Sequence, residues 1–452
     1  MSVPVIPPRV RPMGPDLIAA ATAMGLFAAA AAAGGVLYLL GHPVHASAAP
    51  LFAHWLPHMG PGTPLAVAVA GLVCWRGPTV TARLPWRRLL VLSYATAVTW
   101  TLSLALVDGW QRGIAGRLTT RPEYLHEVAG ITDIPTMLHG FTRRILDFQP
   151  DSWTTHVAGH PPGALLVFVW LDRAGLDGGG WAGLLCVLVG ALVAVAVPHT
   201  VRVVGSDAAA RAVVPFVVLF PGAVWIGTSA DGLFAGVTAA GTALLAHGVT
   251  RGTAAAALGG GVLLGFGCYL SYGLVLMAAI AAAVVVLGGM HRRTAWWALM
   301  GAALVATAFT VAGFDWLTGY HLVTERYYQG LASRRPYGYW VWADLAILAV
   351  AAGPAAAVVL RRATLTGWQA GTLRPGRLAG QGAWLLPLAA TAAVAAADLS
   401  GYSKAEVERI WLPFAVWLMA GTALIPPGDR RAWLAGQAAV ALAVNHLLLT
   451  TW

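Results

Sequence analysis

Charged side chains are scarce in this chain. Only 10% of its 452 residues are Asp, Glu, Lys or Arg, whereas 58% are hydrophobic. Ordinary globular domains carry about 25% charged residues, so this composition excludes a soluble protein. Uncharged apolar stretches of about 20 residues, the length that spans a bilayer as a helix, recur along the chain. The sequence therefore predicts a polytopic membrane protein.

Cysteine is almost absent as well. The three cysteines, Cys74, Cys186 and Cys268, lie inside apolar runs, where a thiol behaves as a small hydrophobic group. Their number excludes a zinc cluster or a disulfide framework. A convincing cleavage site is also missing after the first apolar run, which begins behind the Pro-rich, Arg-containing segment 7–11. We therefore expect this run to be a retained span and not a signal peptide.

Positive charge is unevenly distributed along the chain, whose net charge is +10. If residues 1–16 lie in the cytoplasm, the cytoplasmic segments hold 17 basic and 3 acidic residues, and the opposite face holds 11 and 15. This bias is typical of a multi-pass protein of a bacterial plasma (inner) membrane, and no basic stripe for nucleic acid remains. We expect the N-terminus in the cytoplasm.

The apolar runs predict helices, because a helix satisfies its own backbone hydrogen bonds in lipid, whereas barrel strands would alternate apolar and polar residues. The predicted fold is an all-α polytopic membrane protein with about 13 transmembrane helices. One of them starts at Gly259–Gly261, which favours tight packing. The spans are expected near residues 17–41, 60–75, 89–107, 180–201, 211–228, 232–249, 254–270, 272–290, 295–316, 340–360, 382–398, 410–425 and 432–450.

Three regions follow from this order. Residues 1–88 form a two-helix N-terminal extension, 89–290 a transmembrane core, and 291–452 a C-terminal transmembrane region with two outer loops. The longest polar stretch, 108–162, is an extracytoplasmic loop of about 55 residues, and loops of this length are usually functional. It ends in a short apolar stretch, Ala164–Leu171, which is too short to span and predicts an interfacial helix.

Carboxylates gather in this loop. Asp108 directly follows a span, which places it at the outer membrane surface, and Glu123, Tyr124 and Glu127 follow within the loop. Such carboxylates suit general-base work or the binding of a divalent cation. An ordinary acidic boundary residue and a solvated loop face explain the same pattern, so both interpretations stay open here.

Two histidines lie at the end of the loop. His156 and His160 are four residues apart, and His160 begins the sequence His-Pro-Pro-Gly. A metal pair on a helix would have this spacing, but the glutamate of the HExxH motif is missing. The Gly and Pro residues favour a corner that closes on a ligand. Asp231 lies in a later outer turn, where a plain turn residue is an adequate explanation.

Basic residues also occur in the two later outer loops. The positive-inside rule explains basic residues only on the cytoplasmic side, so those in the outer loops need another explanation. Arg334, Arg335 and Tyr337 lie in one loop, and Glu406 and Arg409 lie in the other. Arginine binds phosphate well through its planar fork, and Arg409 at the membrane border suits a lipid phosphate. Snorkelling, or pairing with the nearby glutamates, is the alternative.

The order of these features resembles the GT-C superfamily of polyprenyl-phosphate-sugar-dependent glycosyltransferases. A span ends in an acidic residue, a long external loop closes at a His-Pro-Pro corner, and a later span begins at a Ser-Ala-Asp turn. The resemblance, which covers roughly 89–290, implies Asp108 as the base, His160–Pro162 as the corner and Asp231 as the later acidic turn. The paired Asp-Glu of many members is missing, so Glu123 is the alternative base, and 1–88 has no counterpart.

The resemblance implies inverting transfer of a sugar, mannose or arabinose, from a polyprenyl phosphate to an extracytoplasmic lipid, glycan or protein acceptor. It requires no cofactor, although Mg or Mn remains an option, and its partners are the lipid-linked donor, the acceptor and membrane lipids. The Ala-, Gly- and Arg-rich composition looks actinobacterial. The expected donor-binding residues are Tyr124, His156, His160, Asp231, Arg334, Arg335, Tyr337, Glu406 and Arg409.

A transporter or lipid flippase is the alternative function, and a non-catalytic scaffold is a third. A transporter would be expected to show charged residues near mid-span and broken helices repeated in two halves. The sequence shows no such repeat, although Pro215 and Pro221 interrupt one run. Most charged residues lie at predicted span ends or in loops, which favours transfer at the outer surface.

Overall fold

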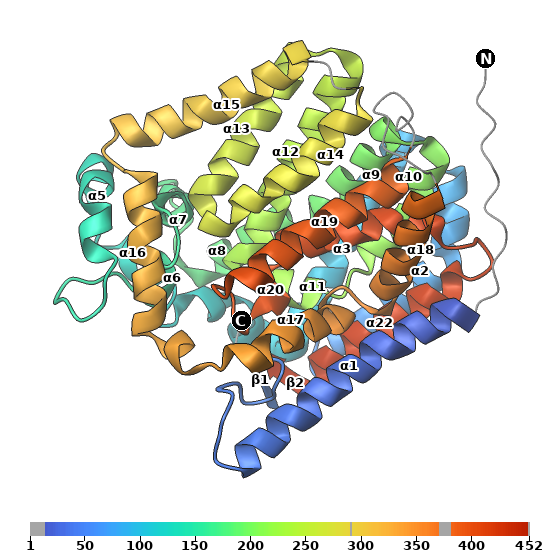
Figure 1. The fold of residues 1–452 in the computed structure, drawn as a ribbon, viewed down its shortest axis with the longest axis horizontal. Helices are drawn as coiled ribbons and strands as arrows, with labels where there is room; N and C mark the ends of the chain where they lie inside the picture. Colours follow the sequence, from blue (N-terminus) through green and yellow to red (C-terminus); the bar gives the residue numbers. More distant parts are fainter. Residues whose placement is uncertain (1–13, 290–291, 370–380, 451–452) are drawn as a thin grey trace.

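The computed structural model describes residues 14–289, 292–369 and 381–450, and these are almost entirely helical (Figure 1). The predicted cytoplasmic residues 1–13, and Arg374 and Arg377 of a predicted cytoplasmic turn, lie outside the described residues. Within the described ranges, seven helices are long and apolar enough to cross a membrane. They are α1 (Gly14–Leu39), α2 (Thr63–Arg83), α3 (Trp86–Ala105) with its extension to Asp108, α8 (Gly178–Gly190) joined to α9 (Val193–Val204), α12 (Ala230–Arg251), α15 (Arg292–Val311) and α19 (Gly382–Ser400).

The predicted class, an all-α membrane protein, agrees with this architecture, but the number of 13 spans is not confirmed. The described residues give seven candidate spans, or eight if one bent helix pair counts as a single span. The other predicted spans coincide with shorter or less apolar helices. These are α10 (Asp207–Val218), α13 (Ala254–Leu270), α14 (Met277–Leu287), α21 (Leu412–Ala415) with η8 (Val416–Leu424), and α22 (Arg430–Leu447).

A bent pair of helices occupies the region of the predicted span over 340–360. Helix α17 (Tyr337–Ala351) and helix α18 (Pro354–Gln369) meet at an angle of 106°. Gly353 has a φ of +83°, a left-handed conformation that glycine adopts without steric cost. Pro354 then begins the next helix, where its missing N–H costs nothing. This pair of residues therefore divides the run into two helices.

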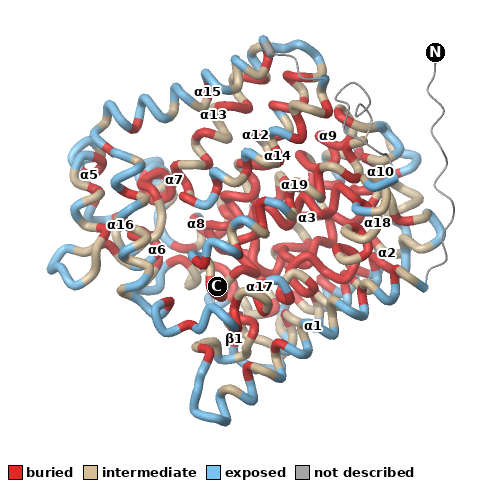
Figure 2. The backbone as a smooth tube through the Cα atoms, viewed as in Figure 1, coloured by how far each residue is buried: buried red, intermediate tan, exposed pale blue. Residues whose placement is uncertain are grey.

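Burial increases toward the middle of the molecule (Figure 2). Within its most apolar window α12 is 72% buried, whereas α1 and α15 are each 17% buried. Glycines bring α13 and α15 together, as the run Gly259–Gly261 predicted: a Cβ on Gly261 would lie 1.9 Å from the Ala298 carbonyl oxygen. Small residues let helix backbones approach closely in this way in membranes.

The segments predicted to lie outside the membrane gather on one side of the molecule. Figure 1 shows α5 (Ile134–Gly140), α6 (Thr155–Ala158), α7 (Pro162–Arg173) and α16 (Trp316–Gln329) together at its left. The Asp147 N–H donates to Gln329 Oε1 at 2.7 Å, which ties the long loop to α16. On the predicted inner side, Arg361 and Arg362 both bind Asp16. In both examples, a segment contacts another segment that is predicted to lie on the same side of the membrane.

Two elements of the loop region depart from the simplest expectation. Most residues of α7 are buried, and the helix packs against α13 instead of lying alone at a surface. The 1–88 extension also reaches the core, because β1 (Ala53–Trp55) pairs antiparallel with β2 (Leu448–Thr450). It therefore belongs to the same packed unit as the regions that follow.

Candidate active site

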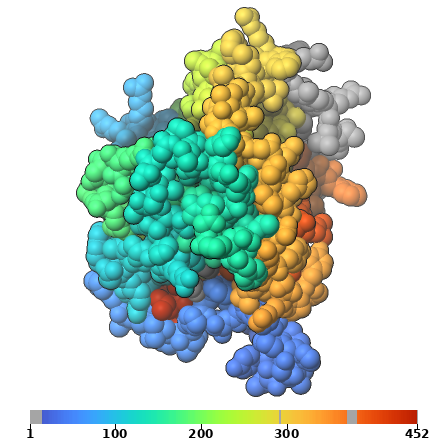
Figure 3. All heavy atoms as spheres, turned by 90° about the vertical axis from the view of Figure 1, so that its left-hand side faces the viewer, coloured from blue at the N-terminus to red at the C-terminus, as the bar shows by residue number. Residues whose placement is uncertain are grey.

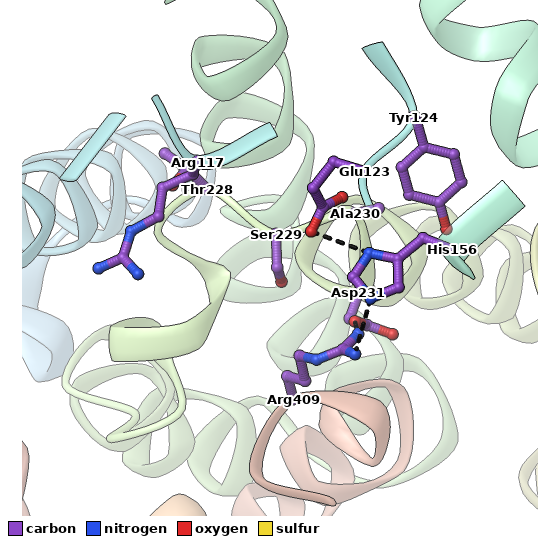
Figure 4. A pocket seen from close by; sticks show the side chains of 9 residues that line it. All are labelled: Arg117, Glu123, Tyr124, His156, Thr228, Ser229, Ala230, Asp231 and Arg409. Carbon is purple, nitrogen blue, oxygen red and sulfur yellow. Dashed lines mark hydrogen bonds and ion pairs between the residues drawn. The ribbon is translucent and has the colours of Figure 1, made fainter. Parts of the chain in front are cut away.

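Four buried side chains from three distant segments form a continuous chain of contacts (Figure 4). Glu123 Oε1 lies 2.8 Å from His156 Nδ1, both in the long outer loop. His156 Nε2 lies 3.4 Å from Arg409 Nη2, and Arg409 Nη1 donates to Asp231 Oδ2 at 2.6 Å. Together with Arg117, Tyr124 and Thr228–Ala230 these side chains line one small pocket. The sequence-predicted residues Glu123, His156, Asp231 and Arg409 thus meet at one site.

The start of α12 positions Asp231. Ser229 is the N-cap, and its hydroxyl accepts the Gly232 N–H at 3.3 Å. Asp231 therefore lies in the first helical turn, where the positive end of the helix dipole favours a carboxylate. Before the cap, Thr228 has a φ of +91°, which is rare for a β-branched residue. Its hydroxyl donates to the Gly113 carbonyl at 2.9 Å and holds this turn against the loop.

Glu406 extends the network to a second arginine. Its two oxygens accept from Arg335 Nη2 and Arg409 Nη2, each at 2.9 Å. Burial alone would raise the pKa of Glu406, but the two guanidinium groups outweigh it and hold that pKa below its usual value. Burial likewise opposes the charge of Arg409, yet Asp231 and Glu406 raise its pKa. Both groups are therefore charged in the folded protein.

The backbone at this position is held in an unfavourable conformation. Ala405 and Glu406 have φ values of +66° and +63°, and two consecutive left-handed residues without glycine cost about 1–2 kcal/mol each. Surrounding contacts fix them: the Ala405 N–H donates to Asp344 at 3.2 Å, and the Lys404 N–H donates to the Tyr327 hydroxyl at 2.9 Å. Strain of this kind concentrates at functional sites.

The contacts of His156 define its tautomer. A guanidinium only donates hydrogen bonds, so Nε2 accepts from Arg409 and Nδ1 carries the proton that is donated to Glu123. Glu123 Oε1 is thereby occupied. Glu123 Oε2 is buried and has no hydrogen-bond partner among the described residues. An unpaired buried carboxylate oxygen is costly, and here it lies in a side chain that lines the pocket.

Tyr124 and His160 lie behind this network. His160 Nδ1 lies 2.7 Å from the His156 carbonyl oxygen and 2.9 Å from the Tyr124 hydroxyl. Burial lowers the pKa of His160 to about 4, so its ring is neutral near pH 7. Burial, assisted by Asp231 and Glu123, raises the pKa of Tyr124. The His-Pro-Pro corner therefore supports His156 as a neutral packing and hydrogen-bonding element.

Asp108 belongs to a neighbouring cluster. Its Oδ1 lies 2.8 Å from His58 Nε2 and 3.3 Å from Arg112 Nη2, and its Oδ2 accepts from Arg117 Nη2 at 3.0 Å. Both carboxylate oxygens are thus engaged by positively charged or ring-nitrogen donors. Asp108 does not line the pocket, although Arg117 does. The structure therefore separates the two carboxylates between which the sequence left the base open.

The remaining predicted residues divide clearly. Arg335 reaches the network through Glu406, whereas Arg334 is exposed and Tyr337 is largely exposed, its hydroxyl donating to the Leu399 carbonyl at 3.3 Å. Sequence reasoning missed Arg117 and His58. Arg117 carries the same signal as Arg334, a cation on the face where topology does not require one. No pattern in the sequence marks His58.

A metal centre built from three ligands is not present within the described part of the chain. No three His, Cys, Asp or Glu side chains come together there with the arrangement of metal ligands. The pocket carboxylates face Arg409 and His156 instead.

Comparisons with known proteins give distant structural likeness. No family model matches the chain, and no curated protein matches it. Among solved structures, it is similar to the crystal structure of the Archaeoglobus fulgidus oligosaccharyltransferase complex with Zn and sulfate, with a TM-score of 0.47 and 11% identity over 79% of this chain. The chain spans about half of that protein's length, 53%. A likeness at this level assigns no substrate and no residue role.

Proposed function

We propose that the protein is a membrane glycosyltransferase that moves a sugar, mannose or arabinose, from a polyprenyl phosphate to an extracytoplasmic hydroxyl acceptor. The observation that carries this proposal is Glu123: one carboxylate oxygen accepts from His156, and the other is buried without a partner among the described residues. An oriented carboxylate with one available oxygen suits a general base.

Glu123 is the proposed base, and His156 orients it. The acceptor hydroxyl gives its proton to Glu123 Oε2 while its oxygen attacks the anomeric carbon. The bond from that carbon to the phosphate oxygen breaks with its electron pair, so the configuration inverts. One carboxylate is sufficient because a lipid phosphate is a good leaving group, whereas glycoside hydrolysis generally requires two.

Arg117 and Arg409 are the proposed contacts of the leaving phosphate. Both line the pocket, and the Arg117 Nε is buried without a hydrogen-bond partner among the described residues. Preorganised donors near developing negative charge are a main source of catalysis. In Figure 4 the Arg117 guanidinium lies apart from Glu123, on the far side of Ser229. Arg117 therefore offers a phosphate contact apart from the base, whereas Arg409 lies beside His156.

The test is donor consumption by purified protein in lipid, with radiolabelled polyprenyl-phosphate mannose and arabinose. We expect Glu123→Gln to lower turnover about a hundredfold or more, because base catalysis contributes about 10²–10⁴-fold, while donor binding is retained. Glu325→Gln, an exposed carboxylate on the outer helix α16, is the matched control and should be fully active. Each assay is run with Mg²⁺, with Mn²⁺ and with a chelator, because a divalent cation remains an open requirement.

Asp108→Asn separates the two candidate bases. Because both Asp108 oxygens are already engaged, we expect this variant to lose thermal stability and to keep a larger share of its turnover than Glu123→Gln. The opposite ranking, with Glu123→Gln active and Asp108→Asn inactive at equal folded yield, would assign the base to Asp108.

Two features of the structure favour the alternative function, a transporter or flippase. The break between α17 and α18 is a discontinuous helix, and Asp344 on α17 and Asp398 on α19 are buried in apolar segments. Broken helices and buried ionisable residues are features of transporters. Substrate flux into liposomes without donor consumption would favour this function over transfer.

A further inference from the structure

A second hollow lies in the long outer loop, and we call it the outer-loop groove. Its volume is about 540 Å³, within the range of about 300–1,000 Å³ that is usual for small-molecule sites. Figure 3 shows the face on which this part of the loop, in teal, lies beside α16, in orange. The groove is lined by Gly130, Ile131, Thr132, Asp133, Thr136, Met137, Gly140, Arg143, Arg144, Gln149, Asp151 and Trp153.

The chemistry of the lining favours a neutral polyhydroxyl ligand. Hydroxyl, amide, carboxylate and guanidinium groups outnumber the apolar side chains, so the groove offers both donors and acceptors. Two arginines, Arg143 and Arg144, are offset by two aspartates, Asp133 and Asp151. The lining therefore has no net charge, and an anion such as a phosphate would meet carboxylates as well as cations.

Arg144 makes one wall of the groove rigid. Its guanidinium lies 3.3 Å from the centre of the Trp153 ring, a cation–π contact. Its Nε donates to the Asp151 carbonyl at 2.6 Å, and its Nη2 donates to Glu127 Oε2 at 3.3 Å. Trp153 is itself fixed, because its indole N–H donates to the Phe141 carbonyl at 2.9 Å. A wall held by four contacts is preorganised for binding.

Hydrogen bonds link this wall to the segment that carries Glu123. Glu127 Oε1 accepts the Thr154 N–H at 2.9 Å, and the Thr154 hydroxyl donates to the Glu123 carbonyl at 3.4 Å. Trp153 lines the groove and His156 lines the pocket. These residues are three apart, so their Cα atoms are at most about 11 Å apart. The groove and the pocket are therefore neighbouring sites formed by the same loop.

We propose that the outer-loop groove binds a neutral carbohydrate acceptor and directs one of its hydroxyl groups to Glu123. The proposal rests on the proposed function, since it identifies the class of acceptor for that reaction. The acceptor oxygen forms the new bond to the anomeric carbon, its proton passes to Glu123 Oε2, and the lipid phosphate leaves with the electrons of the broken bond.

The test is binding without donor, so that it does not depend on turnover. Saturation-transfer NMR is recorded on protein in nanodiscs with mannotriose, with arabinotriose and with inorganic phosphate. Thr136→Trp fills the groove at an exposed position of α5. Ser333→Trp is the matched control, at an exposed position outside the groove. We expect one trisaccharide to bind wild type and Ser333→Trp, and to bind Thr136→Trp at least tenfold more weakly.

The proposal is overturned if neither trisaccharide binds wild type, or if Thr136→Trp binds as wild type does. Displacement of the sugar by equimolar phosphate also overturns it, in favour of an anion site. Failure of the transferase itself is seen separately. If wild type consumes donor but binds no trisaccharide, the proposed function stands and the groove proposal fails. If wild type binds a trisaccharide but consumes no donor, the groove binds carbohydrate and the proposed function fails.

Discussion

Glu408, which is buried beside Arg409 in the sequence, shows how a single buried group makes stability depend on pH. Its Oε1 accepts the Phe52 N–H at 3.0 Å, and its Oε2 is buried without a hydrogen-bond partner among the described residues. Burial raises the pKa of Glu408 to about 7, from 4.5 for an unperturbed glutamate. Between these values the folded protein holds a proton that the unfolded chain has lost. Stability therefore falls as the pH rises through this window.

We predict that Glu408→Gln flattens this pH dependence. In the wild type the effect is on the order of 3 kcal/mol, at about 1.4 kcal/mol per pKa unit, and it is fully present below pH 4.5 and lost above pH 7. Glutamine keeps an acceptor for Phe52 but does not titrate. Melting temperatures in detergent at pH 5 and pH 8 measure the effect. Wild type should lose several degrees over this range and the variant clearly fewer, so identical losses would contradict the assignment.

At the residue scale, the sequence singles out several side chains that line one pocket, but it does not predict how they pair. Glu123, His156 and Asp231 were singled out by position in the loop or turn, and Arg409 by its place at the border. Their meeting could not be predicted, because Asp231 and Arg409 are 178 residues apart in the chain. The engagement of Asp108 by His58 was equally hidden, since it depends on how the first loop folds back.

At the element scale, hydrophobic length predicts helices well, and local breaks are missed. Long uniform runs such as α12 and α15 form where they were expected. The run over 340–360 was expected to be one span because its composition is apolar throughout, yet Gly353 and Pro354 divide it. The run over 211–228 becomes the 12-residue helix α10 and, after a break, the four-residue helix α11 (Ala223–Ile226). The mean hydropathy of a long run does not reveal such breaks, because a single glycine or proline can end a helix without changing that mean much.

The contact between α13 and α15 gives the prediction for elements. A Cβ on Gly261 would lie 1.9 Å from a backbone oxygen of α15, whereas one on Gly259 meets only a Leu244 side-chain carbon at 3.6 Å. We therefore expect Gly261→Val to force the helices apart and to lower the melting temperature and folded yield sharply. Gly259→Ala, two residues away, should be tolerated. Equal stability of the two variants would argue against this packing.

For the whole molecule, orientation in the membrane rests on the charge bias, and the structure makes it testable. Segments predicted outside join one another, as Asp147 joins Gln329, and segments predicted inside do the same, as Asp16 joins Arg361. The fold therefore has two separate polar sides, and these contacts do not determine which of them faces the cytoplasm. From the 17 basic and 3 acidic residues of one side we propose that this side faces the cytoplasm.

Labelling of single cysteines with a membrane-impermeant maleimide decides the orientation. Thr120→Cys in the long loop and Ala208→Cys near the start of α10 are both at exposed positions, and the native Cys74, Cys186 and Cys268 are buried or partly buried. In intact cells we expect Thr120→Cys to be labelled and Ala208→Cys to react only after permeabilisation, with wild type as the background. The reverse pattern would place the pocket in the cytoplasm. Donor and acceptor would then have to be sought among cytoplasmic molecules, because the pocket and the outer-loop groove lie on the same side as Thr120.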